Sequence, residues 1–196
     1  MGKYIEKTDT KFTYKDYCGW SEERWELIDG KAFKMTPAPS KNHQDTLREL
    51  FLKIGNFLIG KPCVLYSSPF DVRLFDTKWQ SDESITTVVQ PDIVVICDHS
   101  KLDEKGCRGA PDLVIEITSP ESIVRDEKIK LSLYEKHTVK EYWIVNPTDK
   151  TISVYTINNK HYNKPLVYKN KDIVKSDFLK GIKIVVENIF EIKLSE

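Results

Sequence analysis

The sequence predicts one α/β domain in which buried β-strands are combined with amphipathic helices. Two apolar, β-branched runs, at 90–96 and 111–117, are typical of buried strands. Two other segments, at 41–59 and 122–136, have apolar residues at helical spacing. The 196 residues are enough for one domain with a substantial core and too few for two comfortable ones, so residues 1–196 are predicted to form a single domain.

A β-hairpin is predicted at 25–35, followed by the first helix. Asp29-Gly30 favours the tight turn with positive φ that joins twisted antiparallel strands. Prolines then end the second strand, and Ser40 is a good N-cap for the helix. The helix has one apolar stripe that we expect to face the core, made of Leu47, Leu50, Phe51, Ile54 and Leu58.

The other strands are short and separated by polar loops. They are predicted at 64–66, 70–75, 141–145 and 151–155, with further short strands in the C-terminal part of the chain. Loops are predicted at 76–84 and 98–109, and a turn at 146–149.

Composition excludes several classes of protein. Thirty basic and thirty acidic residues cancel, which argues against a polybasic binder but leaves room for a local basic groove. We find no signal peptide and no apolar run of membrane-spanning length, so no membrane partner is expected. The four cysteines lack zinc spacing, which predicts reduced thiols and a cytoplasmic location, with Cys97 as a small buried apolar side chain.

Asp92 and Glu116 are the most informative residues, because each places a carboxylate in an apolar strand. Ionised carboxylates are almost never fully buried without a partner, since the loss of hydration costs several kcal/mol. Two of them on neighbouring strands would repel each other, and a divalent cation such as Mg²⁺ offsets that repulsion through oxygen ligands. The pair therefore predicts a metal site.

A structural role stays open for some of these carboxylates. Asp92 could begin a strand after Pro91 with its side chain bonded to a turn, and Asp112 is expected to do so after Pro111. Asp112 and Glu116 face the same side of one strand, but at about 3.3 Å per residue they lie about 13 Å apart, too far to share an ion.

The helix predicted at 122–136 places a lysine on its apolar face. At about 100° per residue, Lys130 falls near the middle of the apolar arc, whereas Lys128 falls on the solvent face. The arc is formed by Ile123, Val124, Ile129, Leu131, Leu133 and Tyr134, with Asp126 beside Lys130. The middle of an apolar stripe is a poor place from which to reach solvent. A lysine directed at the carboxylate site could instead hold a phosphate oxygen or an attacking water.

His43 lies on the inward face of the first helix, four residues before Leu47. Two interpretations stay open for this side chain. It is either a core histidine bonded to a backbone carbonyl, or a contact to an acidic residue or bound substrate at the site.

Two strand carboxylates and a lysine, with proline before the first carboxylate, resemble the site of the PD-(D/E)XK nucleases. One position departs from that pattern, because the residue two after Glu116 is Thr118 rather than lysine. The whole chain is similar to the Uma family of restriction-endonuclease-like proteins, in which the lysine lies on the following helix. The resemblance covers about residues 12–192, through segments 12–17, 25–30, 37–39, 90–94, 110–116, 119–120, 141–145 and 178–181, with His43 and the spacing of 126, 130 and 134.

The resemblance implies a restriction-endonuclease-like fold, with a mixed central β-sheet flanked by helices and the hairpin near its N-terminus. It also implies hydrolysis of DNA phosphodiester bonds with Mg²⁺ or Mn²⁺ as the cofactor. Asp92 and Glu116 would bind the metal together with the backbone carbonyl of Ile117. Lys130 would be the displaced catalytic lysine, and Glu26 and His43 would be further residues of the site.

A metal-dependent DNA endonuclease is therefore the predicted function, and a homodimer would supply two sites for cutting both strands. The alternative is a catalytically weak or relict nuclease-fold protein that acts as a nucleic-acid-binding or assembly module. The neutral net charge and the missing lysine at 118 favour that alternative. A nuclease for RNA or single strands is less favoured, because we find no aromatic stacking platform.

Overall fold

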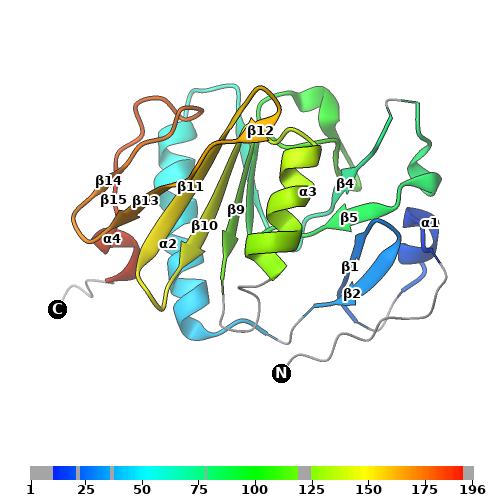
Figure 1. The fold of residues 1–196 in the computed structure, drawn as a ribbon, viewed down its shortest axis with the longest axis horizontal. Helices are drawn as coiled ribbons and strands as arrows, with labels where there is room; N and C mark the ends of the chain where they lie inside the picture. The colour runs from blue at the N-terminus through cyan, green and yellow to red at the C-terminus, as the bar shows by residue number, and fades with distance from the viewer. Residues whose placement is uncertain (1–10, 21–22, 36–37, 78, 119–124, 192–196) are drawn as a thin grey trace.

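A large mixed sheet forms the centre of the molecule (Figure 1). The computed structural model describes residues 11–20, 23–35, 38–77, 79–118 and 125–191. The strands of this sheet are β3 (Val64–Ser67), β6 (Ile93–Ile96), β9 (Leu113–Ile117), β10 (Glu141–Asn146), β11 (Thr151–Asn158), β12 (His161–Tyr162) and β13 (Leu166–Lys169). They are arranged as β12-β11-β10-β9-β6-β3, and β13 also pairs with β11. The central β9 and β10 are parallel, whereas β6 is antiparallel to both of its neighbours. Both apolar runs, at 90–96 and 111–117, are thus confirmed as buried strands.

Helix α2 (Lys41–Leu58) covers one face of the sheet. Its start is fixed as predicted, because the Ser40 hydroxyl accepts a hydrogen bond from the His43 backbone N–H at 3.3 Å. The predicted stripe packs on the sheet, with Leu50, Ile54 and Leu58 buried and Leu47 and Phe51 partly buried. The strand residues beneath it are Ile93, Val95, Leu113, Ile115, Ile117, Trp143 and Val145. Alternate residues of β9 therefore face α2, and Val114 and Glu116 face the other side.

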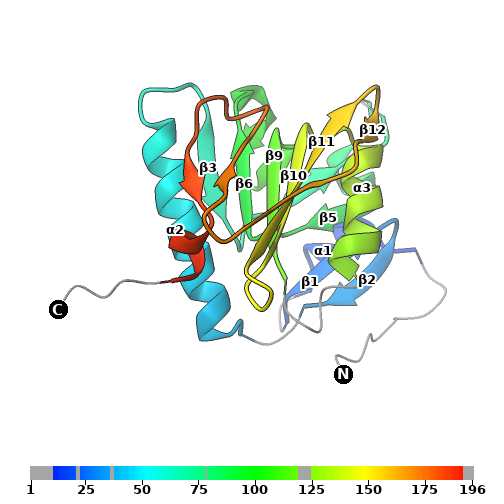
Figure 2. The same ribbon diagram turned by 60° about the vertical axis from the view of Figure 1, so that its left-hand side comes forward.

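Helix α3 (Leu131–Lys136) lies on that other side, and Figure 2 shows the sheet between α2 and α3. A π-helical turn (Arg125–Lys130) leads into α3, where the sequence predicts one continuous α-helix. The residues predicted to begin that helix, 122–124, lie outside the described part of the chain. The wider i→i+5 turn shifts the helical phase, so Ile129 is 39% exposed rather than part of the apolar arc. Lys130 is nevertheless buried and Lys128 is exposed, as predicted.

A second sheet of six strands packs against the α3 side of the first. It runs in the order β2-β1-β5-β4-β8-β7, made of β1 (Trp25–Ile28), β2 (Lys31–Lys34), β4 (Val72–Leu74), β5 (Thr87–Val89), β7 (Leu102–Asp103) and β8 (Gly106–Arg108). The predicted hairpin is confirmed as β1 and β2, with positive φ at Asp29 (48°) and Gly30 (83°). It is not an isolated hairpin, since β1 also pairs with β5.

The prediction of an irregular loop at 98–109 is wrong, because β7 and β8 lie within it. These strands are two and three residues long and rich in charge, so they lack the apolar run that signals a strand. Long-range pairing of β8 with β4 holds them in place. Gly106 permits that close approach, because a Cβ at this position would lie 2.3 Å from the Asp71 carbonyl oxygen.

Shorter elements complete the fold. They are α1 (Tyr14–Tyr17), β14 (Ile173–Val174), β15 (Ile184–Val185), α4 (Glu187–Phe190) and two 3₁₀ turns at Asp82–Ser84 and His99–Lys101. In the described part of the chain, no helix is both long enough and apolar enough to cross a bilayer.

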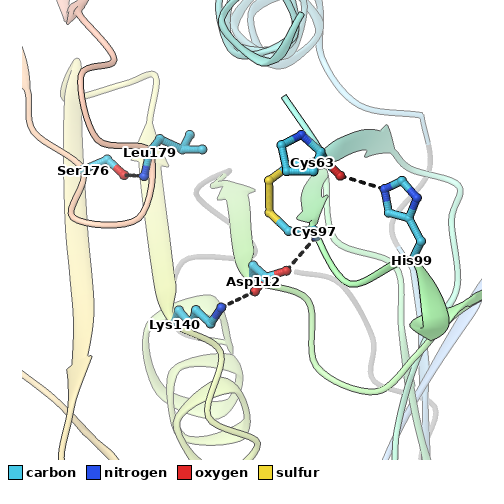
Figure 3. The surroundings of a disulfide bond; sticks show 8 residues. Cys63, Cys97, His99, Asp112, Lys140, Ser176 and Leu179 are labelled. Carbon is cyan, nitrogen blue, oxygen red and sulfur yellow. Dashed lines mark hydrogen bonds and ion pairs between the residues drawn. A yellow bond between two sulfur atoms is a disulfide. The ribbon is translucent and has the colours of Figure 1, made fainter. Parts of the chain in front are cut away.

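A disulfide joins Cys63 and Cys97 at one end of β3 and β6 (Figure 3). The prediction that Cys97 is a free buried side chain is therefore wrong. Antiparallel pairing of Val64 with Ile96 brings the two cysteines opposite each other, at a Cα–Cα distance of 3.9 Å. Such pairing depends on strand register, which cysteine spacing along the chain does not reveal.

Asp112 has the structural role expected of it. Its carboxylate accepts a hydrogen bond from the Cys97 backbone N–H at 2.8 Å and contacts the Lys140 ammonium at 2.6 Å (Figure 3). These contacts lie at the start of β9, at the opposite end of that strand from Glu116.

Candidate active site

The antiparallel pairing of β6 with β9 brings Asp92 and Glu116 together. Ile93 lies opposite Ile115, so extending the register by one residue places Asp92 opposite Glu116. Glu116 lies toward the face that carries α3 and the second sheet, because side chains alternate along a strand, whereas Asp92 directly precedes β6 and contacts His43 of α2. The two carboxylates that the sequence places in separate runs are thus neighbours in the sheet.

Lys130 lies between two carboxylates. Its Nζ is 2.7 Å from Glu116 Oε1 and 2.9 Å from Glu26 Oε1. The side chains of Lys130, Glu116 and Glu26 are only 2%, 6% and 0% exposed. Because a buried charge is stable only when it is paired, this lysine compensates two acids from two different sheets. Glu26 also accepts a hydrogen bond from the Gln90 backbone N–H at 3.1 Å.

Tyr134 is a member of this cluster that sequence reasoning did not assign to the site. Its hydroxyl donates to Glu116 Oε1 at 2.9 Å. Complete burial and the nearby Glu116 carboxylate raise the pKa of Tyr134 well above its usual value, so the phenol stays a neutral donor. The sequence feature that could have indicated this role is the position of Tyr134 four residues after Lys130, which puts both side chains on one helix face.

Asp92 is more open to solvent than these residues. Its carboxylate is 17% exposed, and Oδ2 accepts a hydrogen bond from the Ile117 backbone N–H at 2.8 Å. The same oxygen is 3.2 Å from His43 Nε2, on a ring that is 13% exposed. Of the two interpretations left open for His43, the structure therefore shows the contact to an acidic residue.

The donor set suits a hard cation. Extending the β6–β9 register places Asp92 opposite Glu116, and both supply the carboxylate oxygens that Mg²⁺ prefers as ligands. Within the described ranges, no group of three or more His, Cys, Asp and Glu side chains forms a complete metal-binding cluster. An ion at this position would therefore need main-chain or water oxygens as well. Ile117 contacts Asp92 through its backbone N–H, so its carbonyl as a metal ligand stays a prediction. The side chain of Asp126 lies outside what the structure describes.

The fold is that of the restriction-endonuclease-like class. The chain belongs to the Uma2 family, which is described as "Putative restriction endonuclease" and matches residues 13–187. "Uncharacterized protein slr1290" from Synechocystis sp. is 27% identical over 153 residues, covering 76% of each chain.

A solved structure shares the fold. It is described as "a putative nuclease belonging to DUF820 from Anabaena variabilis" and superposes with a TM-score of 0.72. The match covers 91% of this chain and 97% of that one at 19% sequence identity, so it establishes the fold alone. The predicted restriction-endonuclease-like fold is thereby confirmed.

Proposed function

We propose that this protein is a metal-dependent endonuclease that hydrolyses DNA phosphodiester bonds. The observation that supports this most strongly is Lys130, buried between Glu116 and Glu26, with the partly open Asp92 opposite Glu116 when the β6–β9 register is extended. Buried ion pairs are weak stabilisers, and apolar replacements are often as stable. A fixed ammonium beside a solvent-accessible carboxylate is better explained by charge stabilisation in a reaction.

Asp92 and Glu116, with the Ile117 carbonyl, would hold Mg²⁺ or Mn²⁺. When bound, such an ion polarises a phosphoryl oxygen and lowers the pKa of a coordinated water. The contacts around the two carboxylates support this assignment, since Ile117 N–H and His43 orient Asp92 while Lys130 and Tyr134 orient Glu116. Such outer contacts commonly orient metal ligands.

Lys130 would stabilise the negative charge that develops on the phosphoryl oxygens. In hydrolysis, a water oxygen forms a bond to phosphorus and releases a proton to solvent, while the bond from phosphorus to the leaving oxygen breaks and that oxygen takes up a proton from solvent. A cation that is already in place stabilises this extra charge most effectively, because the protein need not reorganise in the transition state. Glu26 serves as a positioning residue, because it binds Lys130 from the second sheet and is itself fixed by the Gln90 N–H.

Nicking of supercoiled plasmid DNA in Mg²⁺ tests the proposal, with Lys130→Ala compared to Lys128→Ala. We expect Lys130→Ala to lower the rate by about 10²-fold or more, the scale of losing one preorganised electrostatic group. Lys128 is exposed and two residues away, so its removal should change the rate by less than about threefold. Lys130→Arg should restore little, because a planar guanidinium cannot replace a compact ammonium.

Two outcomes would contradict this assignment. Folded wild-type protein without metal-dependent nicking would favour the relict, nucleic-acid-binding alternative. A critical Lys128 with a silent Lys130 would show that the wrong lysine has been assigned.

The finer features of the function belong to the same proposal. Double-stranded DNA is the proposed substrate, and a homodimer would cut both strands with its two sites. The cytoplasm is the proposed location on the grounds of that substrate, because the Cys63–Cys97 disulfide removes the argument from reduced thiols.

A further inference from the structure

We infer that Arg24 binds a DNA backbone phosphate beside the scissile one, and that Gln90 positions its guanidinium for this contact. The inference rests on the proposed endonuclease function and adds a residue that positions the DNA backbone at the site. Three features of the structure support it: the charge of Arg24, the rigidity of its support and its distance from the acidic cluster.

The charge of Arg24 is not offset by a carboxylate among the described residues. Its contacts are to uncharged oxygens, with Nη2 and Nε at 2.6 and 3.2 Å from Gln90 Oε1 and Nη2 at 3.4 Å from Ser68 Oγ. The other arginines with described side chains (Arg48, Arg73 and Arg108) each pair with Asp or Glu. The positive charge of Arg24 is therefore available to bind an external anion.

Gln90 is held so that its carbonyl oxygen faces Arg24. Its Nε2 donates to the Tyr17 hydroxyl at 3.0 Å and to Asp71 Oδ1 at 2.8 Å. Tyr17 in turn donates to Asp71 Oδ1 at 2.9 Å, and burial raises the pKa of Tyr17, so it stays a neutral phenol. With both amide hydrogens directed at these acceptors, only Oε1 is left to bind the guanidinium. The exposed Arg24 is thus oriented by Gln90, which Tyr17 and Asp71 hold in place.

Arg24 also lies close to the acidic cluster. It directly precedes β1, and its carbonyl extends the hairpin pairing by accepting from Met35 N–H at 2.9 Å. Residues two apart on a strand point to the same side at a spacing of about 6.6 Å, so exposed Arg24 lies beside buried Glu26. Gln90 connects the two, because its backbone N–H binds Glu26 while its side chain binds Arg24.

A phosphate is the anion that fits this arrangement. Arginine presents five donors in a rigid fork that matches phosphate oxygens, and within the described residues Nη1 makes no hydrogen bond. The proposed site cleaves a phosphodiester, and Arg24 lies close to it. We therefore expect the phosphate that Arg24 contacts to belong to the same DNA strand as the scissile phosphate. Arg24 would thereby set the register of the backbone over Asp92 and Glu116.

The salt dependence of DNA binding tests this contact. A fluorescein-labelled DNA duplex is titrated with protein in Ca²⁺, an oxygen-preferring ion used in place of Mg²⁺, over a series of salt concentrations. We expect Arg24→Ala to weaken binding about tenfold. It should also reduce the slope of log K against log salt by about 0.9, the value for one phosphate contact on B-DNA. Arg48→Ala is the matched control, because it removes an exposed arginine that pairs with Asp45 and Glu49 of its own helix.

The role of Gln90 is tested by a double-mutant cycle. Gln90→Ala should weaken binding less than Arg24→Ala, since the charge remains but its orientation is lost. The double variant should bind no worse than Arg24→Ala alone, because Gln90 is proposed to act through Arg24. Additive losses would overturn the positioning role.

The outcomes separate this inference from the proposed function. Wild-type protein that binds and nicks DNA, with equal salt slopes for Arg24→Ala and Arg48→Ala, would overturn the inference and leave the function intact. An Arg24→Ala variant that loses nicking but keeps the wild-type slope would do the same. Wild-type protein that neither binds nor nicks DNA would overturn both.

Discussion

Arg73 and Lys130 are both buried cations that contact two carboxylates, and they differ in where those acids lie. Arg73 is 0% exposed and pairs with Asp82 and Asp103, whose side chains are 27% and 43% exposed. The Lys130 cluster is closed, because Glu26 and Glu116 are 0% and 6% exposed. Solvent thus helps to stabilise the acids around Arg73, whereas those around Lys130 depend on the lysine.

The two clusters also differ in what they connect. Arg73, on β4, pairs with Asp82 of the turn at Asp82–Ser84 and with Asp103 of the edge strand β7 of the same sheet, and Arg108 also pairs with Asp82. Lys130 instead joins the two sheets through Glu26 and Glu116, and the β6–β9 register, extended by one residue, places Asp92, which is partly open to solvent, opposite Glu116. A buried ion network alone therefore does not indicate an active site. The proposed site differs from the Arg73 network because its paired acids are closed to solvent, whereas Asp92 is 17% exposed.

The largest expected effect is on stability. Lys130→Ala should lower the free energy of unfolding by about 3–5 kcal/mol, because it leaves two acids buried without their cation. Arg73→Ala should cost less, about 1–3 kcal/mol, because the acids left behind are already partly hydrated. Urea unfolding of both variants measures the difference. A larger loss of unfolding free energy for Arg73→Ala than for Lys130→Ala would contradict the proposed difference between the closed and the open network.

The second expected effect is a response to metal that only one cluster should show. Mg²⁺ or Mn²⁺ should raise the melting temperature, by the equivalent of about 2.7 kcal/mol at a hundredfold excess over Kd, because it binds only the folded state. Glu116→Gln should abolish this shift, whereas Asp82→Asn, which changes the Arg73 network, should keep it. Differential scanning fluorimetry provides the measurement. A metal-dependent rise in melting temperature that persists in Glu116→Gln would show that the ion binds at a site other than Glu116.

The smallest expected effect concerns one hydroxyl group. Tyr134→Phe removes a hydrogen bond to the charged Glu116 and should cost about 1.5 kcal/mol together with several-fold in nicking rate. Tyr162→Phe is the matched control, because that hydroxyl donates to the neutral carbonyl of Val139 at 3.0 Å. It should cost about 1 kcal/mol and leave the nicking rate unchanged. Equal effects on rate would show that Tyr134 acts only through stability.

The sequence predicts the features that depend on local pattern. The Asp-Gly hairpin, the Ser40-capped helix and the two strand carboxylates follow from turn chemistry, capping and apolar runs. The inward position of Lys130 also follows from helical phase, even though the π-helical turn displaces Ile129.

Features that depend on long-range pairing are not visible in the sequence. The strands at 102–108, the Cys63–Cys97 disulfide and the burial of Arg73 all arise where segments far apart in the chain meet. Glu26 is a similar case, because only the resemblance to the Uma family indicated it as a further residue of the site, and its contact to Lys130 depends on how the two sheets pack.

The junction of two sheets at Lys130 also sets an order of events during synthesis. The ribosome releases Glu26 before Lys130, which follows roughly a hundred residues later, and at about 5–20 residues per second this takes about 5–20 s. Glu26 has no counter-charge from Lys130 during that interval, so we expect its carboxylate to stay hydrated and the hairpin to stay undocked. Arrival of Lys130 would then complete the junction between the two sheets in one step.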